Sequence, residues 1–137
     1  MTDQVQLGEL LVDQSDVDLW ATISGADSRL HLDPEWATPR YGGTIVPAIL
    51  IACKALALID IKVPAGASTH RPALVRTKIR SAVHPGQRIQ VWVNPPGDGQ
   101  TREAIDYRCV TAEGVAVIEG SIRFGAQEVR RGAGTSA

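Results

Sequence analysis

The sequence predicts one α+β domain in which an antiparallel sheet wraps around a single long helix. The first observation is an apolar segment that runs almost unbroken over 45–61. From Pro47 onward only Lys54 and Asp60 are charged in it, and a helix that is apolar nearly all round is a buried one. We expect a helix over 47–60, which at a rise of about 1.5 Å per residue would be about 21 Å long, too short for the roughly 30 Å core of a bilayer.

The second observation is a series of four strand-like runs after the helix. They cover 73–83, 88–94, 102–111 and 115–124. Side chains in these runs alternate with the period of two that a half-buried strand requires. Gly- and Pro-containing turns separate them, which predicts an antiparallel meander. One buried helix layered on such a sheet is an α+β fold.

Composition narrows the class of protein. With 14 Lys+Arg against 15 Asp+Glu the net charge is -1, which gives no reason to expect nucleic-acid binding. No leader pattern opens the chain, so we expect neither a signal peptide nor a membrane anchor, and a cytoplasmic location. Cys53 and Cys109 lack CxxC spacing and are expected to be packed, reduced thiols. The folded domain is expected over 1–126, followed by a disordered tail over 127–137.

The stretch before the long helix is predicted to hold short elements and a polar loop. We expect a first strand over 5–12 and an amphipathic helix over 16–24, capped by Ser15. Asp33 followed by Pro34 is an N-cap with Pro at the first helical position, which predicts one helical turn over 34–38. A Tyr-Gly-Gly sequence then breaks the chain before the long helix. His70 and His84 lie beside turns and are expected at the surface.

Three segments together form a recognisable pattern. They are SGADSRLHLDPEWA over 24–37, YGGTIVPAIL over 41–50 and AVHPGQRIQVWV over 82–93. This order resembles the MaoC-like, (R)-specific enoyl-CoA hydratase family. That family carries Ser-Gly-Asp-x-Asn-Pro-x-His-x-Asp-Pro, then Gly-Gly-x-Ile-x-His-Gly-Met-Leu, then a Pro-Gly-Asp turn. The likeness covers roughly 15–124 and implies the hotdog fold, a sheet wrapped around one helix.

The resemblance also implies a reaction. It indicates a lyase of fatty-acid metabolism that adds water to a trans-2-enoyl-CoA, or removes water from a 3-hydroxyacyl thioester. The substrate would be an acyl-CoA or acyl-carrier thioester, so coenzyme A enters only as part of the substrate, and no other cofactor and no metal is expected. Members of this family resemble one another in placing substrate at a subunit interface. We therefore expect a homodimer, or a heterodimer with a second hotdog subunit.

Hydration needs a base for water, an acid for the α-carbon and donors for the enolate oxygen. The resemblance makes His31 the water-activating imidazole; alternatively it is a loop histidine bonded to a neighbour. The family carboxylate falls on Ala26, so Asp27 is the candidate substitute in the acid/base pair; alternatively Asp27 faces solvent. Ser28, Gly43 and Ala48 are the expected substrate contacts. Ser28 would use its hydroxyl, unless that only stabilises the turn, and Ala48 the N–H at the helix start.

Two other functions stay open. The departures from the family pattern at Ala26 and Ser28 also fit a non-catalytic hotdog subunit that pairs with an active hydratase. A hotdog thioesterase is the third hypothesis, because one fold hosts both chemistries. A row of basic residues would suit the phosphates of coenzyme A, or simply form a solvated strand face. These residues are Arg71, Arg76, Lys78 and Arg80.

Overall fold

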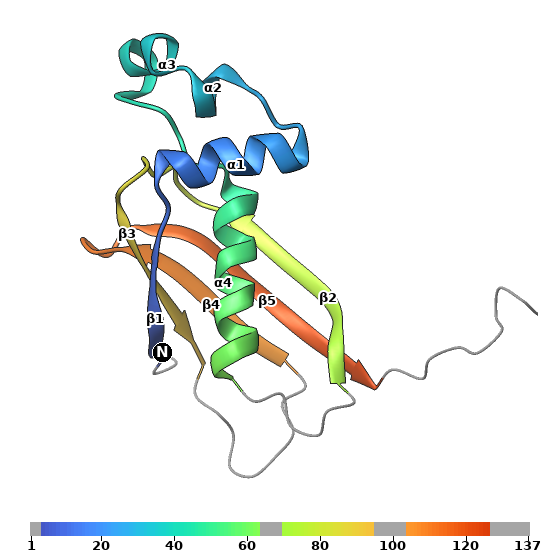
Figure 1. The fold of residues 1–137 in the computed structure, drawn as a ribbon. Coiled ribbons are helices and arrows are strands. Elements are labelled where there is room, and N and C mark those ends of the chain that lie inside the picture. The colour runs from blue at the N-terminus through green and yellow to red at the C-terminus, as the bar shows by residue number, and fades with distance from the viewer. Residues whose placement is uncertain (1–3, 64–69, 95–103, 127–137) are drawn as a thin grey trace, which may run out of the picture.

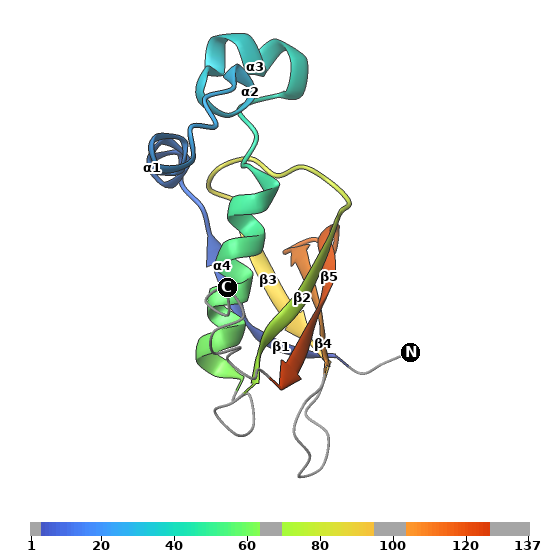
Figure 2. The same ribbon diagram turned by 90° about the vertical axis from the view of Figure 1, so that its right-hand side faces the viewer.

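A helix and a five-stranded antiparallel sheet form the two layers of the molecule. A computed structural model describes residues 4–63, 70–94 and 104–126, so the tail expected over 127–137 lies outside the described residues. α4 (Ala48–Lys62) lies on one face of the sheet, and three shorter helices lie beyond its N-terminal end (Figure 1). Figure 2 shows the same two layers from the side. No helix of the described ranges is long and apolar enough to cross a membrane.

The strands are arranged in the order β1-β3-β4-β5-β2. Their bounds are β1 (Val5–Leu11), β2 (His70–Ile79), β3 (Arg88–Val93), β4 (Ala104–Thr111) and β5 (Ala116–Ala126). The predicted meander is correct for β3, β4 and β5. It is wrong for β2, which pairs with β5 and forms an edge of the sheet. The link from β2 to β3 passes the N-terminal end of α4, where Val46 N–H donates to Val83 O at 2.9 Å. Through this link the chain crosses from β2, at one edge, to β3, on the far side of β4 and β5.

The core lies between the sheet and the near face of α4. Its members on the helix are Leu50, Ile51, Ala52, Ala55 and Ile59, and those on the sheet include Ile89, Val91, Ile105 and Ile118. The phenol of Tyr107 crosses the middle of β5 to reach Thr77, and the two hydroxyl oxygens lie 2.7 Å apart. A Cβ on Gly120 would lie 2.6 Å from that ring, so glycine is what allows the crossing.

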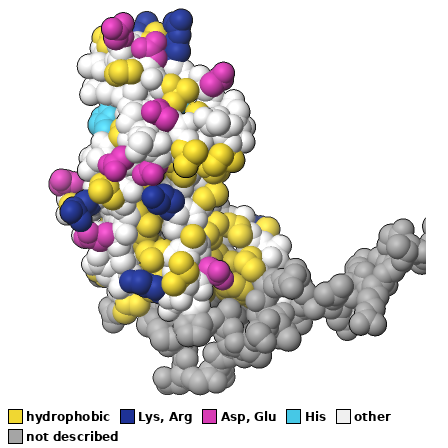
Figure 3. Space-filling model, in the orientation of Figure 1, with side chains coloured by type: hydrophobic (Ala, Val, Ile, Leu, Met, Phe, Trp, Pro, Cys, Tyr) yellow, Lys and Arg dark blue, Asp and Glu magenta, His cyan; other side chains and the backbone are white. Residues whose placement is uncertain are grey.

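The expectation of a helix buried all round is wrong for this chain alone. Ile49 and Ile61 are 65% and 80% exposed on the side of α4 turned away from the sheet, and Cys53 is exposed with them rather than packed. Apolar side chains accordingly gather on the surface over α4 (Figure 3). The physical reason is coverage: the sheet can bury only the face that it touches. The helix also begins one residue later than predicted, with Pro47 as its N-cap.

The shorter helices are α1 (Gln14–Ser24), α2 (Arg29–Leu32) and α3 (Pro34–Tyr41). The predicted cap at Ser15 is wrong: Asp13 caps α1, and its N–H donates to the Asp16 carboxylate at 3.0 Å. That places Asp16 at the third helical position, from which it can reach back. The cap at Asp33 is confirmed, and the turn after it extends into an eight-residue helix.

Candidate active site

His31 is held by the short segment that leads into α4. Its Nδ1 lies 2.6 Å from the carbonyl oxygen of Ile45, and Ile45 N–H donates to Leu30 O at 3.0 Å. Because a carbonyl only accepts, Nδ1 carries the proton and donates it. In the neutral ring the lone pair is therefore on Nε2, the form that a general base requires. The ring is half-buried, and its position does not depend on a carboxylate.

His84 approaches the same segment from the β2–β3 link. Its Nδ1 lies 2.8 Å from the carbonyl oxygen of Thr44, and its backbone N–H donates to the Gln87 side chain at 2.7 Å. Ile45 thus forms hydrogen bonds to Leu30 and His31 on one side of the segment. Thr44 and Val46 form theirs to His84 and Val83 on the other side, the alternation found in the middle strand of a sheet. The prediction of a surface histidine is wrong, because His84 is half-buried against this segment.

Gly43, a predicted substrate contact, lies under the His84 ring. A Cβ at this position would be 3.4 Å from Nδ1 of His84, and the backbone has φ +151. Both facts favour glycine, the only residue that adopts this conformation without strain. The structure therefore gives Gly43 a close ring contact, while its role toward substrate stays a prediction.

Asp27 lies on the exposed loop between α1 and α2. Its N–H donates to Gly25 O at 3.1 Å, and among the described residues no hydrogen bond or ion pair involves its carboxylate. Ala26, beside it, is exposed as well. The structure thus does not bring Asp27 and His31 into a described contact. Gly25, at φ +74, supplies the left-handed turn from which this loop leaves α1.

Ser28 and Ala48 lie at two helix starts. The Ser28 hydroxyl oxygen accepts from Leu30 N–H at 3.3 Å and caps α2, which is the turn-stabilising role left open from the sequence. At the start of α4 the Pro47 carbonyl accepts from the N–H groups of Leu50 and Ile51. Within the described residues the N–H of Ala48 has no acceptor, so it remains an available donor.

Gln14 and Thr44 are two residues of this region that the sequence pattern does not predict. The Gln14 amide donates to His31 O at 2.9 Å and accepts from Thr44 Oγ1 at 2.7 Å. It therefore ties α1, α2 and the segment before α4 together. Thr44 is 7% exposed, one of two buried polar residues in the described core. The position of Thr44 between two glycines and an apolar run could have marked it in the sequence as a residue of the site. Nothing in the sequence around Gln14 indicates its role.

The two described cavities lie away from these residues. One, of about 380 Å³, opens between α4 and the β2 side of the sheet, and its walls are mostly apolar. They are formed by Leu56, Ala57, Ile59, Asp60, Pro72, Val75, Ile122 and Phe124. The other is a shallow groove of about 620 Å³ over β2 and β5. Among the described residues no group of three or more His, Cys, Asp or Glu could hold a metal ion.

Comparison with known proteins identifies the fold. No protein-family model and no curated protein matches the sequence. The (R)-hydratase from A. caviae involved in PHA biosynthesis has a TM-score of 0.74 and 19% identity, over 92% of this chain and 96% of that chain. A MaoC-like dehydratase from Rhodospirillum rubrum has a TM-score of 0.71 and 16% identity, over 90% of each chain. The HadBC complex from Mycobacterium tuberculosis, a 3R-hydroxyacyl-ACP dehydratase, has a TM-score of 0.66 and 14% identity, over 91% and 98%.

The chain is therefore a hotdog-fold protein, with one helix on a five-stranded antiparallel sheet. Within that fold it is similar to MaoC-like hydratases and dehydratases, which confirms the resemblance carried by the three sequence segments. At identities of 19% and less this likeness defines the architecture. The reaction depends on the side chains of the site.

Proposed function

We propose that the protein is an acyl-thioester hydratase or dehydratase that uses His31 as its base. The observation that supports this most directly is the 2.6 Å contact from Nδ1 to Ile45 O, which leaves the Nε2 lone pair for a water molecule. In the hydration direction, Nε2 takes a proton from water while the oxygen of that water bonds to C3 of the enoyl thioester. The C2–C3 π electrons move toward the thioester carbonyl, whose oxygen becomes an enolate.

The remaining roles fall to residues of the same region. We assign the enolate oxygen to the N–H of Ala48, because a donor at a helix start faces developing negative charge favourably. Asp27 is the proposed acid: its protonated carboxyl group gives a proton to C2, and the proton that His31 has taken from water restores it through solvent. Its carboxyl group has no described bond to give up. Asp33, by contrast, accepts from Trp36 N–H at 3.2 Å and would have to abandon a cap. Ser28 and Gly43 are proposed to line the thioester.

We further propose an acyl-CoA or acyl-carrier substrate, a cytoplasmic location and an assembly of two hotdog subunits. The apolar cavity of about 380 Å³ beside α4 suits an acyl chain. HadBC, which the fold matches, is a complex of subunits. Coenzyme A or the carrier would be part of the substrate, and the proposed chemistry uses no further cofactor.

The test is turnover of crotonyl-CoA and longer trans-2-enoyl-CoAs by purified protein. Removing a general acid or base typically lowers the rate by about 100- to 10,000-fold. We expect His31→Ala to fall in this range and Asp27→Asn toward its lower end. Glu35→Gln, an exposed carboxylate of the first turn of α3, is the matched control and should leave the rate unchanged. Full activity of His31→Ala would refute the assignment, and release of free coenzyme A thiol would indicate a thioesterase.

A second candidate function is a non-catalytic hotdog subunit. The exposed, unbonded carboxylate of Asp27 and the alanine at position 26 both favour it. This alternative predicts no turnover by the wild-type chain, and turnover after Ala26→Asp combined with Ser28→Asn. The first proposal predicts instead that the wild-type chain itself turns over the substrate.

A further inference from the structure

His31 lies on an element that cannot hold it in place alone. α2 has only four residues, and residues 22–29, which lead into it, are all exposed. A single helical turn is unstable by itself, because fixing its backbone costs more than its few hydrogen bonds return. The position of His31 therefore depends on bonds from α2 to other parts of the fold, and α1 is the helix next to it (Figure 1).

Gln14, in the first turn of α1, provides such a bond. Its Nε2 donates to His31 O at 2.9 Å and to an Asp18 carboxylate oxygen at 3.0 Å. Both partners only accept, so the NH2 group must lie on this side and the amide cannot be turned over. Its Oε1 then faces Thr44, whose hydroxyl donates to it at 2.7 Å. The amide thus uses both of its N–H groups within the chain and leaves neither for a substrate.

These bonds close a hydrogen-bonded cycle around His31. Gln14 joins His31 O to the hydroxyl of Thr44. The next residue, Ile45, has its carbonyl oxygen 2.6 Å from Nδ1 of His31. One histidine is therefore held, at its backbone and at its imidazole, by two consecutive residues of the segment before α4. Loss of the Gln14 amide opens this cycle at two bonds at once.

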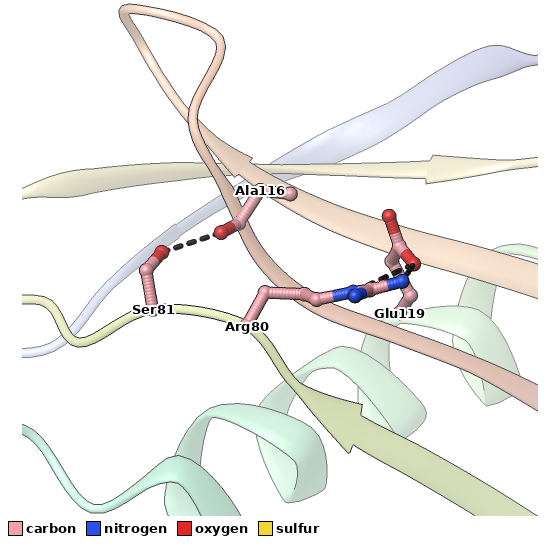
Figure 4. Close-up of polar contacts among 4 residues, drawn as sticks. All are labelled: Arg80, Ser81, Ala116 and Glu119. Atoms are coloured by element: carbon pink, nitrogen blue, oxygen red, sulfur yellow. Dashed lines mark hydrogen bonds and ion pairs between the residues drawn. The ribbon is translucent and has the colours of Figure 1, made fainter.

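The segment over 44–46 is the fixed side of the cycle. Its bonds to the β2–β3 link lie on the side turned away from α2. The link is itself fixed on β5, where Arg80 forms an ion pair with Glu119 at 3.0 Å. Beside this pair the Ser81 hydroxyl donates to the carbonyl oxygen of Ala116, at the start of β5 (Figure 4). The side of the cycle that moves when it opens is therefore α2, which carries the histidine.

The cycle bears directly on the chemistry of the imidazole. While Nδ1 of His31 donates to Ile45 O, the lone pair stays on Nε2 and points in one direction. A base has to lie within about 3.2 Å of the group whose proton it takes. A displacement of about 1 Å, even one caused by a remote change, can cost about 100-fold in rate. A residue that keeps the cycle closed therefore acts on the reaction without touching the reacting atoms.

We propose that Gln14, with Thr44, is a positioning residue that holds His31 in the tautomer and the orientation of a base. The effect on turnover rests on the proposed function. The state of the imidazole does not, because it is measured in the protein without any substrate. The two readouts can therefore fail separately.

Gln14→Glu is the main variant. It keeps the length of the side chain and the acceptor for Thr44, but it sets a carboxylate oxygen against the two acceptors that Nε2 now binds. Thr44→Val removes only the hydroxyl bond, at nearly the same size. Gln87→Glu is the matched control, because the same charge change falls on the far side of the segment. There Gln87 only accepts, from His84 N–H at 2.7 Å.

The first readout is the tautomer of His31, measured by long-range proton–nitrogen NMR correlation at about pH 8.5, where histidine is ordinarily neutral. We expect a proton on Nδ1 in wild type and in Gln87→Glu, and a mixture of both tautomers in Gln14→Glu and in Thr44→Val. A proton fully on Nδ1 in the last two variants would overturn the proposal, and so would a mixture in the control. If Gln14→Glu does not fold, as circular dichroism would show, Thr44→Val decides alone.

The second readout is turnover of crotonyl-CoA. We expect Gln14→Glu to lower kcat by up to about 100-fold with an unchanged KM, because the amide has no N–H free for substrate. A raised KM at unchanged kcat would overturn the positioning role, since Gln14 would then act on substrate binding. An inactive wild-type chain would instead refute the proposed function, and the tautomers of His31 would still decide the role of Gln14.

Discussion

The two faces of α4 have similar composition and very different surroundings. Ile51 and Ile59 on the sheet side are 1% and 2% exposed, whereas Ile49 and Ile61, which turn away from the sheet, are 65% and 80% exposed. Each buried Å² of apolar surface contributes about 25 cal/mol of stabilisation. The uncovered face of α4 contributes little in the single chain, because most of its apolar surface remains in water. The chain therefore buries only one of the two apolar sides of this helix. Its uncovered face is apolar surface that stays in contact with solvent in the single chain.

The two cysteines give the largest contrast. Cys53 is exposed on the uncovered face of α4, while burial raises the pKa of the Cys109 thiol to about 12. At pH 8 a thiol with that pKa is ionised to only about one part in 10,000, and the thiolate is the nucleophile. We expect iodoacetamide to modify Cys53 alone in the native protein, and both thiols after unfolding in guanidinium, as read by peptide mass spectrometry. Native Cys53→Ser protein should stay unmodified; rapid modification of Cys109 in it would contradict the buried-strand assignment.

The buried face of α4 should dominate stability. Leu50→Ala is expected to lower the free energy of unfolding by roughly 2 to 5 kcal/mol, because the neighbours of a buried leucine cannot fully close the cavity. Guanidinium unfolding followed by circular dichroism measures this change. Leu56 is only partly buried, so Leu56→Ala should cost less, although both leucines lie in the same apolar segment and the sequence alone does not distinguish them. Equal losses in both variants would mean that the helix is rotated from the orientation described.

The sequence predicts the fold well where local chemistry decides. Helical spacing, strand alternation and the Asp33 cap are set by residues near one another, and each has its counterpart in the structure. The place of β2 beside β5, rather than beside β3, depends on how the link crosses the end of α4. The period-two alternation of side chains predicts which of them share a face of the sheet. It does not predict which strands are neighbours in the sheet.

The candidate site is less predictable for the same reason. The motif locates His31, and its bond to Ile45 joins two segments that are neighbours only in the folded chain. Gln14 reaches His31 from 17 positions away, and no spacing rule relates the two. Asp27 is close to His31 in the sequence without a described contact between them, so proximity along a loop does not by itself assemble an acid/base pair. Roles in catalysis remain predictions for the activity assay.

The smallest expected effect is on the uncovered face of α4. Ile49→Ala and Ile61→Ser remove side chains that the single chain leaves mostly in solvent, so each should change the free energy of unfolding of the isolated chain by no more than about 0.5 kcal/mol. Ile49 is the exposed neighbour of the buried Leu50, so Ile49→Ala and Leu50→Ala form a direct pair. If the uncovered face belongs to an interface between subunits, both variants should instead weaken association of the chain, measured by analytical ultracentrifugation. A loss of about 2 kcal/mol or more in the isolated chain would show that the face is already covered, and the contrast between the two sides of α4 would fail.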